Sequence, residues 1–154
     1  MQIFDDQGRK PLKVTDVSVL IKAISGAHPG ARKIIFISTI GNTVVGGEDG
    51  SIDLSKASVQ GHVRITWTFD QVSLPDCKFY TTWSDALWVK LHDDEPKRPT
   101  YPQSWYALAE PFVSTDRKSL SCINSNLKGT AYTYTAMWLD GQVPVYVDPK
   151  IRNY

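Results

Sequence analysis

Residues 127–140, LKGTAYTYTAMWLD, read as a turn followed by one long β-strand. Successive side chains of a strand point to opposite faces of its sheet. One face of this strand carries the aromatic and small residues Tyr132, Tyr134, Ala136 and Trp138, and the other carries Thr133, Thr135, Met137 and Leu139. We expect the aromatic face to be buried, because aromatic side chains fill much of a protein core.

The same alternation of apolar and polar residues appears in other parts of the chain. It is cleanest over residues 63–70, and it recurs over residues 17–23. Residues 34–40, IIFISTI, are apolar on both faces, which predicts a strand in the middle of a sandwich. Further strands are expected at residues 105–112, 120–123, 131–139 and 143–147, and the tail DPKIRNY is expected to add an edge strand.

Many short strands separated by regular turn signals favour two packed sheets over one open sheet. We therefore predict an all-β fold, an antiparallel two-sheet sandwich of immunoglobulin-like type, with a small β-barrel as the alternative. The chain of 154 residues is long enough to bury one substantial core. Residues 1–154 are accordingly expected to form a single domain.

The charge balance argues against some classes of partner. The chain has 17 basic and 16 acidic residues, and they are scattered rather than gathered into the basic face that nucleic acid requires. The start, MQIFDDQGRK, does not resemble a signal peptide, and no apolar run is long enough to span a bilayer. We therefore expect a cytoplasmic protein without nucleic acid or a membrane span, and with Cys77 and Cys122 as free thiols. They would form a disulfide only if the protein were exported.

Two resemblances to known families rest on short segments. The segment LKGTAYTYTAMWLDG resembles the corner before the penultimate strand of fibronectin type III and other immunoglobulin-like domains. This resemblance implies that the hydroxyl of Tyr132 binds the backbone. The chain is longer than one such domain and lacks the Cys, Trp, Cys spacing of a true immunoglobulin core. Residues 41–67 resemble the bacterial inclusion-body protein family in their pattern of a hairpin, an apolar-polar step and a strand after Gly61. This resemblance implies self-association and transfers no catalytic residue.

No pattern in the sequence predicts a catalytic, metal or cofactor site. Acidic clusters at residues 5–6, 48–53 and 93–95 are interpreted as solvated turns, with a calcium loop as the alternative. The three histidines, His28, His62 and His92, lack the spacing of zinc ligands. No phosphate-binding loop, nucleophile elbow or dinucleotide fingerprint is present, so an enzymatic activity is left open and no cofactor is predicted.

Aromatic residues around the acidic, proline-rich segment HDDEPKRPTYP, residues 92–102, are the remaining functional signal. If exposed, they would form a stacking surface for a sugar ring or for the side chains of a partner protein. The alternative is that they cover one end of the sandwich. The predicted ligand-binding residues are Trp88, Asp93, Asp94, Lys97, Tyr101 and Trp105.

Three functions follow from this reasoning. The first is a non-enzymatic binding or interaction domain that uses this loop region. The second is a structural protein that self-assembles through exposed strand edges. A hydrolase acting on carbohydrate is the third, since fold alone does not determine function.

Overall fold

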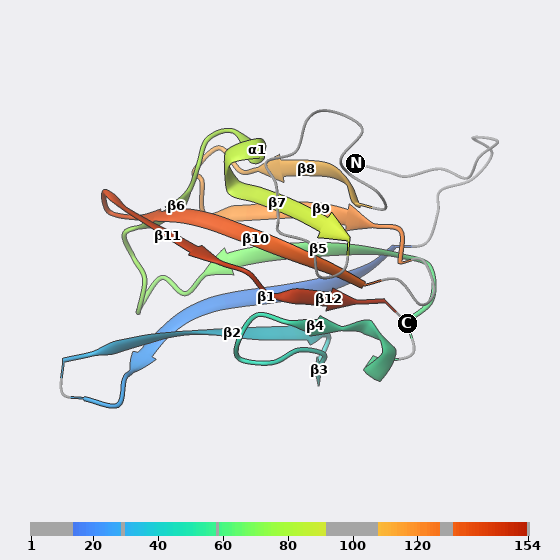
Figure 1. Ribbon diagram of the computed structural model, residues 1–154, viewed down its shortest axis with the longest axis horizontal. Helices are drawn as coiled ribbons and strands as arrows, with labels where there is room; N and C mark the ends of the chain where they lie inside the picture. The colour runs from blue at the N-terminus through green and yellow to red at the C-terminus, as the bar shows by residue number, and fades with distance from the viewer. Residues whose placement is uncertain (1–13, 29, 58, 92–107, 127–130, 154) are drawn as a thin grey trace.

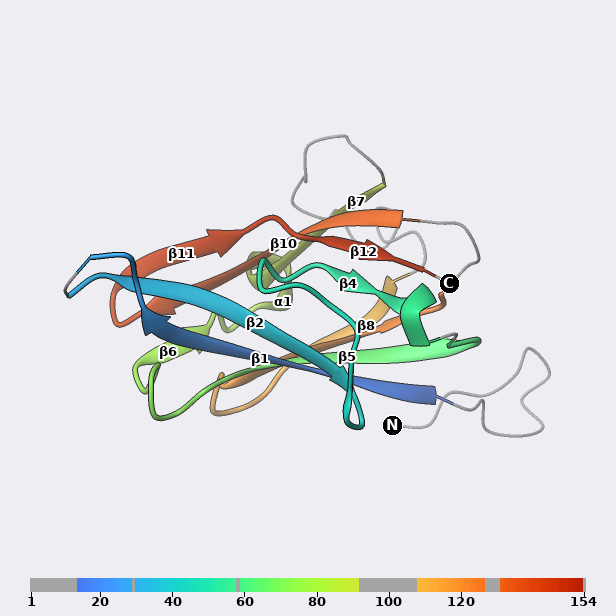
Figure 2. The same cartoon turned by 90° about the horizontal axis from the view of Figure 1, so that it is seen from below.

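A computed structural model describes residues 14–153, apart from residues 29, 58, 92–107 and 127–130. Two sheets pack face to face with their inner side chains forming the core (Figures 1 and 2). The prediction of an all-β, two-sheet fold is confirmed. Helical structure in these residues is limited to a short 3-10 turn, η1 (Leu54–Ala57), and one α-helical turn, α1 (Trp83–Ala86). No helix of the described ranges is long and apolar enough to cross a membrane.

The first sheet contains six strands in the order β3-β2-β1-β5-β9-β8. Their bounds are β1 (Val14–Ser25), β2 (Arg32–Ile40), β3 (Thr43–Val44), β5 (His62–Phe69), β8 (Leu108–Val113) and β9 (Ser119–Asn124). The central strands bury Val17, Val19 and Ile21 of β1 and Val63, Ile65, Trp67 and Phe69 of β5, as their alternation predicted.

The second sheet is organised around β10 (Ala131–Asp140), the strand predicted from its aromatic face. The order β11-β10-β12-β4 forms one path through this sheet, and β6 and β7 also pair with β10. The bounds are β4 (Ile52–Asp53), β6 (Cys77–Phe79), β7 (Leu87–Leu91), β11 (Val143–Val147) and β12 (Lys150–Arg152).

Strand direction and position differ from the prediction in three respects. Both sheets are mixed, because β1 runs parallel to β5 and β12 runs parallel to β4. The chain reaches these pairs through crossovers, and only antiparallel neighbours can be joined by a tight hairpin. β2 lies beside the edge of its sheet and exposes Ile37, so its apolar run does not mark a central strand. β12 lies between β10 and β4 and buries Ile151, so it is not an edge strand.

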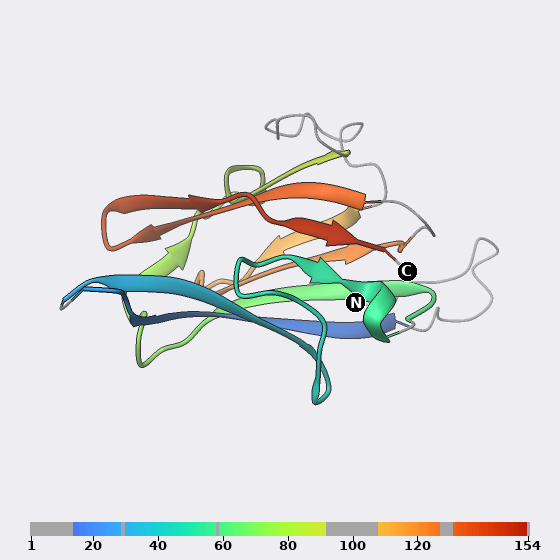
Figure 3. The ribbon, with the colours of Figure 1, turned by 60° about the horizontal axis from the view of Figure 1, so that its bottom comes forward.

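One side of the sandwich is closed by the segment between β3 and β4. The amide of Val45 donates to the carbonyl oxygen of Ser38 in the first sheet, at 2.9 Å. Ile52 pairs with Ile151 in the second sheet, and the amide of Asp53 donates to the carbonyl oxygen of Val45, at 2.6 Å. Figure 3 shows β4 between β2 and β12. On this side the two sheets are therefore linked by backbone hydrogen bonds.

The aromatic faces of β5 and β10 meet in the centre of the core. The ring centroids of Trp67 and Tyr134 are 5.3 Å apart, and those of Phe69 and Trp138 are 5.7 Å apart. The indole Nε1 of Trp67 donates to the Tyr134 hydroxyl at 3.3 Å, and that hydroxyl donates to the carbonyl oxygen of Gly50 at 2.7 Å. Tyr134 thus ties β10 to the loop before β4. The side chain of Tyr132, which the resemblance to immunoglobulin-like domains implicated, lies outside the described part of the chain.

The two cysteines are buried and do not form a disulfide, which confirms the prediction of free thiols. Burial raises the pKa of the Cys77 thiol to about 11, with a further contribution from the negative charge of Asp140. Burial alone raises the pKa of Cys122 to about 12. Cys122 faces inward beside the aromatic core, where it acts as a small hydrophobic residue.

Candidate binding surface

Trp88 is the one predicted binding residue that the structure describes. It lies half-buried in β7, and its indole Nε1 donates to the carbonyl oxygen of Ser84 at 2.7 Å. The other predicted residues, Asp93, Asp94, Lys97, Tyr101 and Trp105, lie outside the described residues. The surface around Trp88 can therefore be followed across the second sheet and not into residues 92–107.

An apolar strip extends from Trp88 across the outer face of the second sheet. Trp88 pairs with Thr135, Tyr146 pairs with Met137, and Pro144 pairs with Leu139. Thr135, Met137 and Leu139 alternate along β10 with the inward-facing Tyr134, Ala136 and Trp138, so they lie on the outer face, where Thr135 is buried and Met137 and Leu139 are half-buried. The apolar strip consists of Trp88, Met137, Leu139, Pro144 and Tyr146. Tyr146 is 70% exposed, which is unusual for so large a side chain in a strand.

Local hydrogen bonds hold the backbone beneath the strip. The Thr135 hydroxyl donates to Oδ1 of Asp148 at 2.6 Å, which joins β10 to the segment between β11 and β12. The turn between β10 and β11 has Gly141 at a φ of 62°, in the left-handed region that glycine adopts without strain. The amide of Gly141 also donates to the carbonyl oxygen of Asp76, at 3.2 Å. Tyr146 is therefore presented from an anchored hairpin.

A cationic hollow of about 650 Å³ adjoins the Leu139 end of the apolar strip. Its lining residues are Pro75, Asp76, Lys78, Arg117, Lys118, Leu139, Gly141 and Gln142. Three of these side chains are basic and one is acidic, so the hollow favours negative charge.

Hydrogen bonds to the backbone orient two of the basic side chains. Nε of Arg117 donates to the carbonyl oxygen of Phe79 at 2.7 Å. Nζ of Lys118 donates to the carbonyl oxygens of Pro75 and Cys77, at 2.7 and 2.9 Å. These contacts fix both cations at the rim of the second sheet and so reduce the entropy lost when a ligand binds them.

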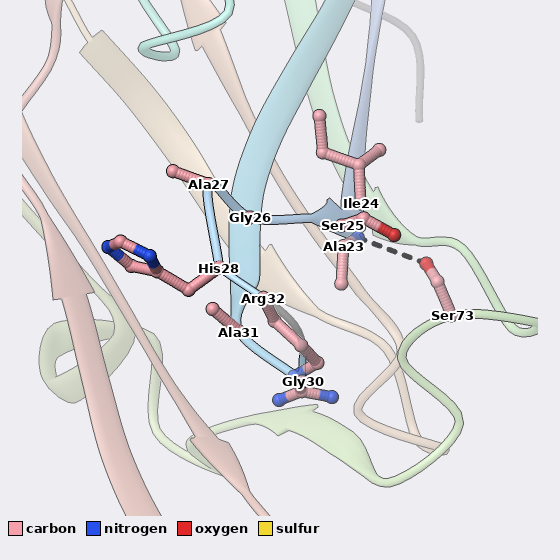
Figure 4. Close-up of a pocket in the computed structure, with 10 residues that line it drawn as sticks. All are labelled: Ala23, Ile24, Ser25, Gly26, Ala27, His28, Gly30, Ala31, Arg32 and Ser73. Atoms are coloured by element: carbon pink, nitrogen blue, oxygen red, sulfur yellow. Dashed lines mark hydrogen bonds between the residues drawn. The ribbon is translucent and has the colours of Figure 1, made fainter.

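A second hollow, of about 700 Å³, lies at the hairpin between β1 and β2 (Figure 4). Small residues dominate its lining, and Figure 4 shows the His28 ring pointing away from Ser73. The Ser73 hydroxyl accepts from the amide of Ala23 at 3.0 Å and donates to Asp70 at 2.6 Å. Arg32 pairs with Asp140 at 2.5 Å. The Ser73 and Arg32 groups are thus engaged in holding the fold together.

The acidic residues at 48–53 act as turn formers, as predicted. Oδ1 of Asp49 accepts from the amide and the hydroxyl of Ser51, at 2.9 and 2.6 Å, and these bonds lower the pKa of the carboxyl group. Asp53 accepts from Ser55 in the same way. Among the residues that the structure describes, no three His, Cys, Asp or Glu side chains gather as a metal site would require.

Tyr146 and Met137 were not among the predicted binding residues. The alternation along residues 132–139 does put Met137 on the face opposite the aromatic core. The sequence does not reveal that Tyr146 lies directly beside it, because this depends on the register between two strands.

No model of a known protein family matches the chain, and a search of curated proteins finds no significant similarity.

Proposed function

We propose that this protein is a non-enzymatic interaction domain that binds a partner protein on the outer face of its second sheet. The exposure of Tyr146 is the observation that carries the proposal. A tyrosine ring held on an anchored strand offers large contact area at little entropic cost, and tyrosine is enriched among the residues that dominate binding energies.

The surroundings of Tyr146 define the chemistry of the partner. The exposed end of the apolar strip fits a bulky apolar side chain packed against Tyr146 and its neighbour Met137. The adjacent cationic hollow, with Lys78 at its edge, fits carboxylates. We therefore infer a partner segment in which an apolar anchor is followed by acidic residues.

Features of the strand edges disfavour the alternative of self-assembly through strand pairing. β11 lies at one edge of the strand order β11-β10-β12-β4, and Pro144 within it has no amide hydrogen to donate to an added strand. β8, at the far edge of the first sheet, is interrupted by an irregularity between Ala109 and Phe112. Proline and bulges are the devices by which proteins protect edge strands.

A selection from a random peptide library displayed on phage tests the proposal. The expected peptides carry a bulky apolar residue near two or more acidic residues, and Tyr146→Ala should weaken their binding about 30-fold, the effect of losing about 2 kcal/mol. Lys78→Glu should weaken it further by charge reversal. The matched control is Phe112→Ala, which removes an exposed aromatic ring from the other sheet. Selected peptides that bind Tyr146→Ala as tightly as the wild type would refute the proposed surface.

A further inference from the structure

Strand β8, at the edge of the first sheet, contains a β-bulge with a residue in a left-handed backbone conformation. Ala109 pairs with Ile123 and Phe112 pairs with Ser121, so two residues of β8 stand against one of β9. The first of the two, Glu110, has a φ of 52°, a left-handed conformation that is costly for a residue other than glycine. Such bulges and strained residues cluster near functional sites.

A hollow of about 440 Å³ lies at this bulge. Pro111, Phe112 and Ile123 provide apolar surface, and Arg64, Glu110 and Ser121 provide polar groups. This volume is within the range of small-ligand sites, about 300–1,000 Å³. Phe112 is 60% exposed, and none of the ring contacts found in the described residues involves it.

The polar groups around the hollow favour a hydroxyl-rich ligand over an anionic one. Arg64 forms an ion pair with Asp16 at 3.3 Å, which balances its charge, and the remaining charge, that of Glu110, repels an anion. The carboxylate accepts hydrogen bonds, the guanidinium donates them and the Ser121 hydroxyl does both. Sugar hydroxyls can satisfy all three groups, while the apolar face of a sugar ring packs against an aromatic ring.

A row of hydroxyl groups continues from the hollow across the sheet. Phe112 pairs with Ser121, Ser121 with Thr66, and Thr66 with Ser18, so the ring of Phe112 and three hydroxyl groups form a row across β8, β9, β5 and β1. The side chains of Ser18, Thr66 and Ser121 face outward, since the neighbouring residues Val17, Val19, Ile65 and Leu120 are buried, and Phe112 is itself exposed. With neighbouring strands about 4.8 Å apart, the row spans about 14 Å, enough for more than one sugar unit.

We infer that this face is a binding site for a neutral oligosaccharide. One sugar ring stacks on Phe112 within the hollow and bonds to Glu110, Arg64 and Ser121. The remaining units extend over Thr66 and Ser18. This site lies on the sheet opposite the proposed protein-binding surface and does not depend on it.

Titration of the isotope-labelled 154-residue chain, followed by NMR, tests the inference. The probes are cellohexaose, xylohexaose, mannohexaose, laminarihexaose and chitohexaose, each added to millimolar concentration. We expect at least one probe to shift the amide resonances of Phe112, Ser121 and Thr66 in a saturable manner. If no probe shifts these resonances, or if the shifts centre on Tyr146, the inference is overturned.

Variants of Phe112 separate stacking from structural effects. Phe112→Leu should weaken binding about tenfold or more, because it keeps an apolar side chain and removes the ring. Phe112→Tyr should retain binding, since it keeps the ring. Tyr146→Ala, on the other sheet, should bind like the wild type. Equal affinities of the Leu and Tyr variants would overturn the stacking role, and unchanged spectra of the free variants would show that both are folded.

Discussion

Replacing Tyr134 by Phe is the sharpest test of how the core is held together. The hydroxyl of Tyr134 is fully buried, donates to the carbonyl oxygen of Gly50 and accepts from the indole of Trp67. Burial raises its pKa well above the ordinary value, so the hydroxyl keeps the proton that it donates. The substitution removes only this oxygen and leaves the ring in its tilted contact with Trp67.

The expected cost follows from the two groups that lose their partner. A buried polar group left without a hydrogen bond costs about 1–3 kcal/mol. The contact with Gly50, at 2.7 Å, is short and strong, whereas the one from Trp67, at 3.3 Å, is long, so the second group adds less. We expect the free energy of unfolding to fall by about 2–3 kcal/mol. For a chain of this size, that corresponds to a decrease in Tm of about 5–10 °C.

Equilibrium unfolding in urea, followed by tryptophan fluorescence, measures this cost. The matched control is Tyr146→Phe, which removes the same oxygen from a side chain that is 70% exposed and should change stability by less than about 0.5 kcal/mol. A Tyr134→Phe variant as stable as the control would refute the reasoning. It would mean that solvent or local relaxation fully replaces the hydrogen bonds of the Tyr134 hydroxyl.

Three further predictions concern single side chains. Ser38→Ala should leave the Tm unchanged or raise it, because the Ser38 hydroxyl is buried without a hydrogen-bond partner among the described residues; a clear decrease in a thermal melt would contradict this. Cys77 and Cys122 should not react with a thiol reagent in the native protein at pH 8, since burial raises both pKa values to about 11 or 12, and both should react in denaturant. Rapid labelling of the native protein would show an open core. Ser51→Ala should destabilise the protein at pH 6 and have less effect at pH 2, because Ser51 lowers the pKa of Asp49 below its usual 3.8. That stabilisation is fully present above pH 3.8 and is lost as the pH falls through the lowered value; urea titrations of both proteins at each pH will measure it.

Part of the candidate surface was predictable from the sequence. The alternation in residues 132–138 placed Met137 on the face opposite the core, and Trp88 was selected because it is aromatic and adjoins a charged segment. The exposure of Phe112 was not predictable. It results from a two-residue bulge whose position depends on the pairing of β8 with β9.

The sequence by itself determined which side chains enter the core. Trp67, Tyr134 and Trp138 are buried as their period of two predicted, because burial of one face is a local property of a strand. Only the tertiary structure decided that β1 and β5 run parallel and that β12 lies between β10 and β4. Backbone donors and acceptors are the same in every strand, so the choice of neighbour depends on crossovers and on the packing of distant residues. Both proposed binding surfaces depend on that choice, since each combines side chains from strands that are far apart in the sequence.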